Sequence, residues 1–250
     1  MEADREKLTA ILKESRRIVF FGGAGVSTES GIPDFRSADG LWNEKLQIAL
    51  TPEQLVSHTY FEKYPEDFFT FYREKLLYPK AKPNGCHRAL AKLEKMGKLQ
   101  AVVTQNIDGL HQAAGSETVY ELHGSVLRNY CQQCGAFYGV QFILDTAPEV
   151  PHCPRCGGIV KPDVVLYEEP LNDQVIRDTV EAIGMADTLI IGGTSLVVYP
   201  AAGLIRYFQG KHLVLINMTE TRADRLAELV IRAPIGEVMA AAVEKLSCET

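Results

Sequence analysis

Short runs of apolar residues recur along the chain, and most are followed by glycine or polar residues. The runs are Ile18–Phe21, Leu99–Thr104, Val119–Leu122, Val164–Tyr167, Thr188–Ile191, His212–Ile216 and Leu229–Ile231. Uninterrupted apolar runs of this length are typical of parallel strands, because both faces of a parallel sheet are covered. We therefore expect seven buried strands, with Val164–Tyr167 resuming the main sheet after an insertion.

Between these runs, apolar residues recur with helical spacing. The segment Met1–Arg16 is predicted to be an amphipathic helix, Asn84 and Asn172 are predicted N-caps, and Pro234 precedes a terminal helix over Ile235–Leu246. Strands that alternate with helices predict a doubly wound parallel α/β sheet, Rossmann-like, with right-handed crossovers.

Two segments interrupt this alternation. Residues 41–80 are rich in aromatic side chains and predict a helical layer with a core of its own, part of which could also wall an apolar channel. Residues 125–163 contain two pairs of cysteines. The predicted division is a Rossmann-like domain over 1–40, 81–124 and 164–250, a helical layer over 41–80 and a small cysteine-containing module over 125–163.

Composition narrows the function classes. The 250 residues carry a net charge of −6 and have a pI of about 5.6, whereas proteins that bind phosphate backbones are usually basic. No stretch resembles a signal peptide, and no apolar run approaches the roughly 20 residues of a membrane span. We expect a cytoplasmic protein with no direct nucleic-acid site and no membrane contact, and a monomer is favoured.

The paired cysteines indicate a metal site. Cys131 and Cys134 form one CxxC, Cys153 and Cys156 form the other, and 18 residues separate the pairs (153 − 134 − 1). This is the spacing of a four-cysteine zinc ribbon, and four thiolates leave no open position on the metal. We predict a structural zinc site, since two disulfides conflict with a reducing compartment and a redox CxxC needs only one pair.

The most informative stretch follows the first strand. Gly23 and Gly25 supply the GxG of a dinucleotide-binding turn, but Thr28 stands where the third glycine of the fingerprint belongs. The next segment, Gly31–Arg36, combines a stiff turn with an acid, an aromatic residue and a base. We predict a ligand-handling loop in place of a plain helix.

Polar residues also follow other predicted strands. Gln105, Asn106 and Asp108 follow the second run, where open α/β sheets bind ligands, although Asp108 could simply cap a helix. His123 precedes a glycine and is equally consistent with a general base or a turn residue. Gly193, Thr194 and Ser195 form a second glycine and hydroxyl turn.

These motifs together resemble the sirtuin family of NAD-dependent protein-lysine deacylases. The resemblance rests on Gly23–Ser27, Gly31–Arg36, Thr104–Asp108, His123–Gly124, the paired CxxC, Gly193–Ser195 and Ile216–Asn217, in that order. In that family the acyl-lysine amide oxygen attacks the nicotinamide ribose, nicotinamide leaves, and the acyl group is transferred to ADP-ribose.

The resemblance also implies residue roles. It gives His123 the role of general base, and Asn106 and Asp108 catalytic positions in a nicotinamide pocket. Residues implied to contact NAD are Gly23, Ala24, Gly25, Thr28, Asp34, Phe35, Arg36, Gln105, Asn106, Ile107, Asp108, Gly193, Thr194, Ser195, Asn217 and Ile231. We further predict that the segment Arg17–Arg36 closes over NAD.

Substrate preference follows from the same resemblance. Acyl-lysine peptides are expected to add as a strand between Val164–Leu171 and Leu196–Tyr199, and Glu168 stands where the family often has glycine. Succinyl-selective members carry arginine three residues after a tyrosine, whereas Lys75 follows Tyr72 at that distance, which predicts an apolar acyl channel. Mono-ADP-ribosyl transfer and a non-catalytic zinc-ribbon or NAD-sensing module are the alternatives.

Overall fold

Parallel strands form the centre of the molecule in the computed structural model, which describes residues 2–34 and 50–249. In spatial order the strands of the main sheet are β3 (Val119–Glu121), β2 (Leu99–Thr104), β1 (Ile18–Gly22), β7 (Thr188–Gly192), β8 (His212–Ile216) and β9 (Leu229–Ile231). All neighbouring pairs are parallel. Every residue of β1 and β7 is buried, which explains their uninterrupted apolar sequences.

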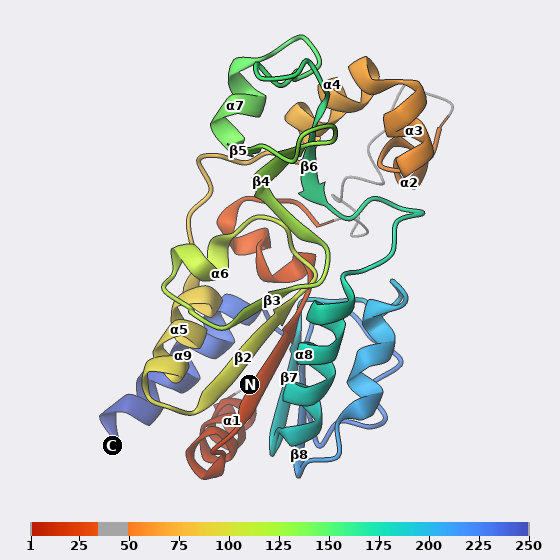
Figure 1. Cartoon of the computed structure of the whole chain (residues 1–250). Coiled ribbons are helices and arrows are strands. Elements are labelled where there is room, and N and C mark those ends of the chain that lie inside the picture. The colour runs from red at the N-terminus through yellow and green to blue at the C-terminus, as the bar shows by residue number, and fades with distance from the viewer. Residues whose placement is uncertain (1, 35–49, 250) are drawn as a thin grey trace.

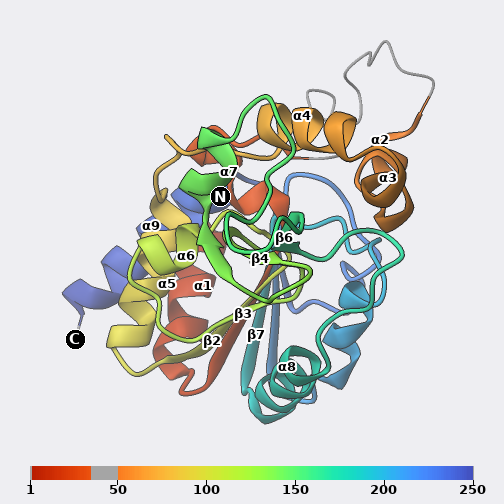
Figure 2. The ribbon, with the colours of Figure 1, turned by 45° about the horizontal axis from the view of Figure 1, so that its top comes forward.

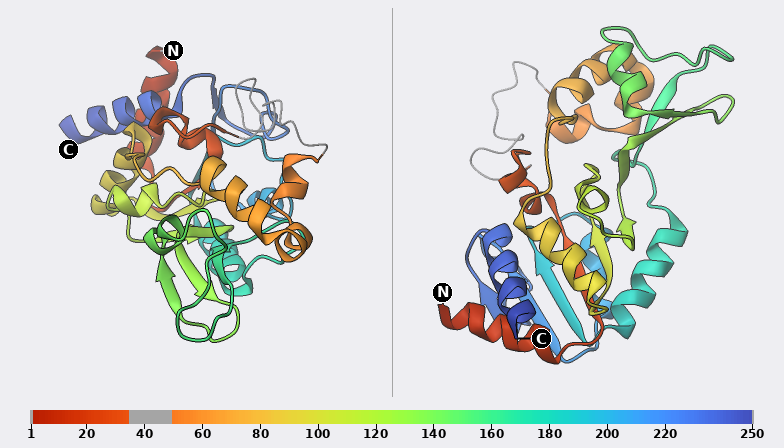
Figure 3. Two further views of the ribbon diagram at one scale, coloured as in Figure 1. Left: turned by 90° about the horizontal axis from the view of Figure 1, so that it is seen from above. Right: turned by 90° about the vertical axis from the view of Figure 1, so that its left-hand side faces the viewer.

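Helices cover both faces of this sheet (Figures 1 and 3). The helices α1 (Glu2–Glu14), α5 (Gly85–Lys95) and α9 (Ile235–Cys248) share one core cluster with one face. The helix α8 (Asp173–Met185) and the 3-10 helix Ala201–Tyr207 pack on the other face. The predicted doubly wound α/β fold is therefore confirmed.

The predicted helix starts are also confirmed. The Asn84 side chain accepts a hydrogen bond from the N–H of Cys86, and Asn172 accepts from Gln174 and Val175. An asparagine oxygen can satisfy N–H groups that have no partner within the first turn of a helix.

A second, smaller sheet lies above one end of the main sheet (Figures 1 and 2). Its antiparallel strands, in the order β5 (Phe137–Gly139), β4 (Gly124–Cys131) and β6 (Val160–Val164), are accompanied by α7 (Val140–Asp145). We call residues 124–164 the four-cysteine module. The prediction that Val164–Tyr167 resumes the main sheet is wrong, because Val164 pairs with Gly124 in the small sheet and Tyr167 bridges to Ser57.

The helical layer, α2 (Pro52–Leu55), α3 (His58–Lys63) and α4 (Pro65–Lys75), lies beside this module. Phe61, Phe68 and Tyr72 share a core cluster with Ile143 of α7 and Val160 of β6. The division of the chain into three parts stays a prediction. Among the described helices, α6 (Leu110–Ala113) included, none has the length and apolarity needed to cross a membrane.

Candidate active site

A large cavity opens where the strands of the main sheet end and the small module begins. Its volume is about 970 Å³, which is at the upper end of the range for ligand pockets. Fourteen predicted site residues line it: Gly23, Ala24, Gly25, Thr28, Asp34, Gln105, Asn106, Ile107, Asp108, His123, Gly193, Thr194, Ser195 and Asn217.

The other three predicted cofactor residues differ. Phe35 and Arg36 lie outside the described residues. The Ile231 side chain is 1% exposed and belongs to the core beneath the sheet. Its carbonyl accepts a hydrogen bond from the N–H of Asn217 at 3.1 Å, so Ile231 contacts the cavity wall only through the backbone.

Two glycine turns meet at the floor of the cavity. The N–H of Gly25 donates to the carbonyl of Gly193 at 2.8 Å. A side chain on Gly193, whose φ is +58°, would bring its Cβ to 2.4 Å from the nitrogen of Val26. These glycines are therefore required by their mutual packing. Ala24, Thr194 and Ser195 of these two turns line the cavity, and such turns suit the pyrophosphate of a dinucleotide.

Ser27 links the polar side chains of the site, and the sequence analysis did not identify it as a site residue. Its hydroxyl donates to Asp108 Oδ2 at 2.6 Å and accepts from Asn106 Nδ2 at 3.0 Å. Ser27 is 1% exposed, whereas Asn106 and Asp108 are half-buried. The sequence signal for Ser27 was a hydroxyl residue two positions after Gly25 of the glycine turn.

Asp108 combines the two roles left open by the sequence. Its Oδ1 accepts a hydrogen bond from the N–H of Leu110 at 2.9 Å, at the start of α6. Its Oδ2 accepts from Ser27. The carboxylate therefore supports the start of α6, whose N-cap is Gly109, and is also a fixed member of the cavity wall.

His123 lies at the junction of the two sheets, between β3 and β4. Its Nδ1 is 2.9 Å from the carbonyl oxygen of Gln105. A carbonyl only accepts hydrogen bonds, so Nδ1 carries the proton and Nε2 is the basic nitrogen of the neutral ring. Burial lowers the pKa of His123 below its usual value, and the Gln105 carbonyl partly offsets that effect.

The backbone at this junction depends on Gly124. Its φ is +73°, and a Cβ there would lie 1.9 Å from the carbonyl oxygen of Asp163. Only glycine fits such a position. The neighbouring N–H of Val165 donates to the His123 carbonyl at 3.0 Å, so both sheets fix the histidine.

The first part of the predicted closing loop is fastened in place. Asn84 Nδ2 donates to the carbonyl of Val26 and to the hydroxyl of Ser30, and Glu29 accepts from the N–H of Gly236 at the start of α9. The chain then turns at Gly31, whose φ is +81°. Closure over NAD stays a prediction.

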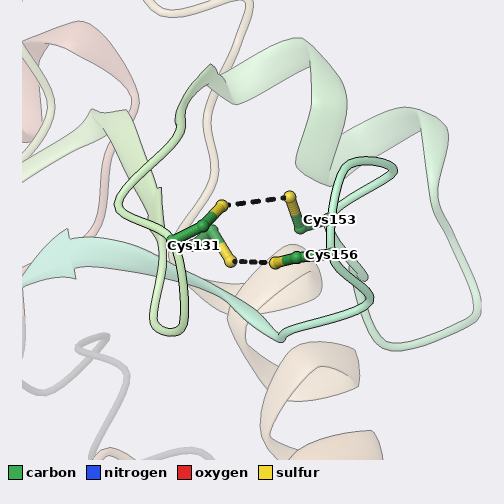
Figure 4. A group of neighbouring side chains, drawn as sticks. Cys131, Cys153 and Cys156 are labelled. Atoms are coloured by element: carbon green, nitrogen blue, oxygen red, sulfur yellow. Dashed lines mark hydrogen bonds between the residues drawn. The ribbon is translucent and has the colours of Figure 1, made fainter.

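The four predicted metal ligands lie together in the small module (Figure 4). Their sulfur atoms all lie within 4.8 Å of one another, with Cys131–Cys156 at 3.4 Å and Cys134–Cys153 at 3.7 Å. A tetrahedral site with Zn–S bonds of about 2.3 Å has sulfur–sulfur edges of roughly 3.8 Å. The thiols therefore fit a zinc ion, and none of them lines the large cavity.

Local backbone geometry explains why each CxxC pair folds this way. The N–H of Gly135 donates to the carbonyl of Cys131, and the N–H of Gly157 donates to that of Cys153. Both glycines have positive φ, a conformation that glycine adopts without strain. The hydroxyl of Tyr138 lies 3.0 Å from Cys153 Sγ.

Comparison with known proteins identifies the family. The model of the Sir2 family matches residues 23–200. An NAD-dependent protein deacetylase of Clostridium perfringens is 67% identical over 245 residues, which cover 98% of this chain and 100% of that protein.

Solved structures agree with the sequence comparison. The crystal structure of a Sir2 homologue in complex with NAD has a TM-score of 0.86 and 38% identity, with 98% of this chain and 94% of that chain covered. A Sir2 structure with a p53 peptide and NAD⁺ has a TM-score of 0.83 and 38% identity, covering 97% and 98%.

Proposed function

This chain belongs to the Sir2 family, and on that premise we propose that it is an NAD-dependent protein-lysine deacetylase with a structural zinc site. The observation that carries the proposal is one cavity that contains both the glycine turns of a dinucleotide site and His123. Its products are nicotinamide, the free lysine and O-acyl-ADP-ribose.

The main sheet would hold the cofactor. The turns at Ala24 and Thr194–Ser195 face the pyrophosphate, and Asn217, after β8, is placed for the adenosine ribose. Bound NAD supplies an electrophilic ribose carbon with nicotinamide as the leaving group. Asn106 and Asp108, held by Ser27, form the polar pocket for the nicotinamide amide.

His123 would act as the general base at Nε2. The Gln105 carbonyl fixes the proton on Nδ1, and the lowered pKa keeps the ring neutral and able to accept a proton at neutral pH. The role requires a substrate hydroxyl within hydrogen-bond distance of Nε2. His123 lines the cavity, so a substrate hydroxyl bound in the cavity can approach its ring.

The acyl chain would lie against apolar side chains from β4, from the loop after β2 and from the segment that follows α4. Leu76, Leu77, Ile107, Val126 and Leu127 line this part of the cavity. Burying a methylene group contributes about 0.8 kcal/mol, so acetyl and longer unbranched acyl groups gain from such a wall.

The residues near Tyr72 support an apolar preference. Tyr72 is fully buried in the core of the small module and the helical layer. Arg73 Nε donates to the carbonyl of Ile143 at 2.9 Å and its Nη2 to that of Glu149 at 2.7 Å, which directs the guanidinium toward α7. Lys75 lines the cavity, and its cation would favour the carboxylate of a succinyl group. Comparing succinyl with acetyl substrates therefore tests the apolar preference.

We expect acetyl-lysine peptides to lose their acetyl group only when NAD is present, with hexanoyl peptides also turned over and succinyl peptides much slower. Mass spectrometry of peptide and protein checks this. Faster desuccinylation contradicts the apolar channel. An ADP-ribosylated acceptor with intact acetyl-peptide favours mono-ADP-ribosyl transfer instead.

The partner would be an acyl-lysine segment of another protein, bound as a strand between Val164–Leu171 and Leu196–Tyr199. Both segments contribute residues to the cavity wall. We propose a cytoplasmic monomer, which light scattering of the purified protein and fractionation of cells would check.

A further inference from the structure

The loop Leu166–Glu169 turns sharply along the cavity wall. The N–H of Glu169 donates to the carbonyl of Leu166 at 3.0 Å, and Glu168, the third residue of this four-residue turn, has φ +77°. A type II turn has this hydrogen bond and this conformation at its third position, where glycine is favoured. Glu168 is one of only two described non-glycine residues with positive φ, the other being Leu196.

The side chain of Glu168 explains why the turn tolerates a glutamate. Its Oε2 accepts two hydrogen bonds from Thr59 of α3, from the N–H at 2.9 Å and from the hydroxyl at 2.7 Å. The N–H belongs to the first turn of α3, which has no partner for it within the helix. These bonds lower the pKa of Glu168, so the carboxylate stays charged at neutral pH.

Neighbouring residues attach the same loop to the same helix. The N–H of Tyr167 donates to the carbonyl of Val56, and the N–H of His58 donates to the carbonyl of Tyr167. His58 Nδ1 lies 2.8 Å from Glu169 Oε1. Residues 56–59 therefore hold three consecutive residues of the loop (Figure 1).

We propose that Glu168 is a positioning residue for the acyl-lysine peptide, which fixes the cavity-lining segment Val164–Leu166 by anchoring the turn to α3. The proposal rests on the proposed function, because it assigns that peptide to this segment. Glu168 does not touch the reacting atoms. It replaces the conformational freedom of a glycine with a side-chain tether, so the loop is ordered before the peptide binds.

Two substitutions separate the tether from the turn. Glu168→Gly retains the positive φ without strain and removes both bonds to Thr59. Glu168→Gln retains an oxygen that accepts from Thr59 but removes the charge. Glu66→Gln is the control, because Glu66 is an exposed carboxylate in the first turn of α4 with no bond to the loop or to residues 56–59.

The test measures the KM for an acetyl-lysine peptide, the KM for NAD, kcat, and amide exchange by mass spectrometry. For Glu168→Gly we expect the peptide KM to rise roughly threefold to tenfold, while kcat and the NAD KM stay within about twofold. Amides of Thr59 and of residues 166–169 should exchange faster, and those of β1 and β7 should not. Glu168→Gln and Glu66→Gln should resemble the wild type.

An unchanged peptide KM in Glu168→Gly overturns the proposal. A parallel loss of kcat and NAD affinity with a lower Tm also overturns it, because that pattern reports general destabilisation. Wild-type protein that fails to deacetylate any acyl-peptide in the presence of NAD overturns the proposed function itself. That result is distinguishable, because it appears before any variant is compared.

Discussion

The main sheet and the four-cysteine module each supply part of one cavity, but different forces hold them together. Both faces of the sheet are covered by helices, and each face has a core cluster that includes residues of β1, β2 and β7. The module has three short strands, and its only described core is shared with the helical layer. Segments of about 40 residues seldom bury enough apolar surface to fold alone, so a metal is the expected supplement.

The two regions therefore contribute different sides of the cavity. The dinucleotide side is set by packed backbone, as the contact between Gly25 and Gly193 illustrates. In the proposed function the acyl-peptide side is set by the module and by the loop at Glu168, and His123 lies between the two sides. Perturbing the module should therefore impair peptide turnover more than NAD binding.

The largest expected effect comes from the zinc site. Cys153→Ser, or zinc removal by a chelator, should abolish peptide deacetylation and leave the Kd for NAD within a few-fold of the wild-type value, because structural zinc supplies folding free energy. Calorimetry measures the Kd for NAD, and a peptide assay measures deacetylation. Cys248→Ser is the control, since Cys248 is exposed and outside the cluster.

Full peptide turnover by protein shown to be zinc-free would contradict this contrast between the main sheet and the four-cysteine module. Equal loss of NAD binding would contradict it as well, because the two regions would then fold as one.

The next effect concerns the junction. His123→Ala should lower kcat by about 10²- to 10⁴-fold, the usual contribution of a general base, without lowering the Tm. His152→Ala is the matched control, since His152 is exposed and is not part of the cavity wall. Because burial lowers the pKa of His123, wild-type kcat/KM should rise with pH with a midpoint below the usual histidine value of about 6.5. A His123→Ala variant with unchanged kcat would remove the histidine from the mechanism.

A smaller effect is expected from the contact between Tyr138 and the cysteine cluster. Tyr138→Phe removes the hydroxyl that lies 3.0 Å from Cys153 Sγ. Loss of such an outer contact typically lowers metal affinity about 10- to 100-fold. Zinc transfer to a chromogenic chelator measures this, with Tyr130→Phe as control, because Tyr130 is a partly exposed residue of the same sheet. Equal transfer rates for the two variants would show that the Tyr138 contact is not used.

The smallest effect concerns His212, the first residue of β8. Burial opposes the charge on His212, but hydrogen bonds to Glu14 at 2.7 Å and Glu228 at 2.6 Å outweigh it and raise its pKa. Lys7 and Lys211 also face this group. The stabilisation is therefore fully present below the unfolded pKa of about 6.5 and is lost as pH rises through the folded value.

Replacement by His212→Gln should remove this contribution. Urea unfolding should show a stability difference from wild type of below about 1 kcal/mol that is larger at pH 6 than at pH 9. A difference that grows with pH would show that the histidine is held neutral.

Much of the fold followed from the sequence, for reasons visible in particular elements. The strands β1 and β7 have apolar runs because both faces are buried, and Asn84 and Asn172 cap helices as their side chains predict. The four cysteines lie together, and the glycine turns and His123 line one cavity.

Other features depend on contacts between distant residues. The run at Val164 is equally apolar in either sheet, and only its pairing with Gly124 decides which one it joins. The role of Ser27 requires Asp108, 81 residues away. The turn at Glu168 requires Thr59, and a glutamate carries no local signal for a positive φ.

The most direct test of the account is the ratio of products from one reaction. Wild-type protein with NAD and an acetyl-lysine peptide should release nicotinamide and free-lysine peptide in equal amounts, with neither product formed when one substrate is omitted. Deacetylation without NAD would contradict the account, and so would nicotinamide release that is independent of the peptide.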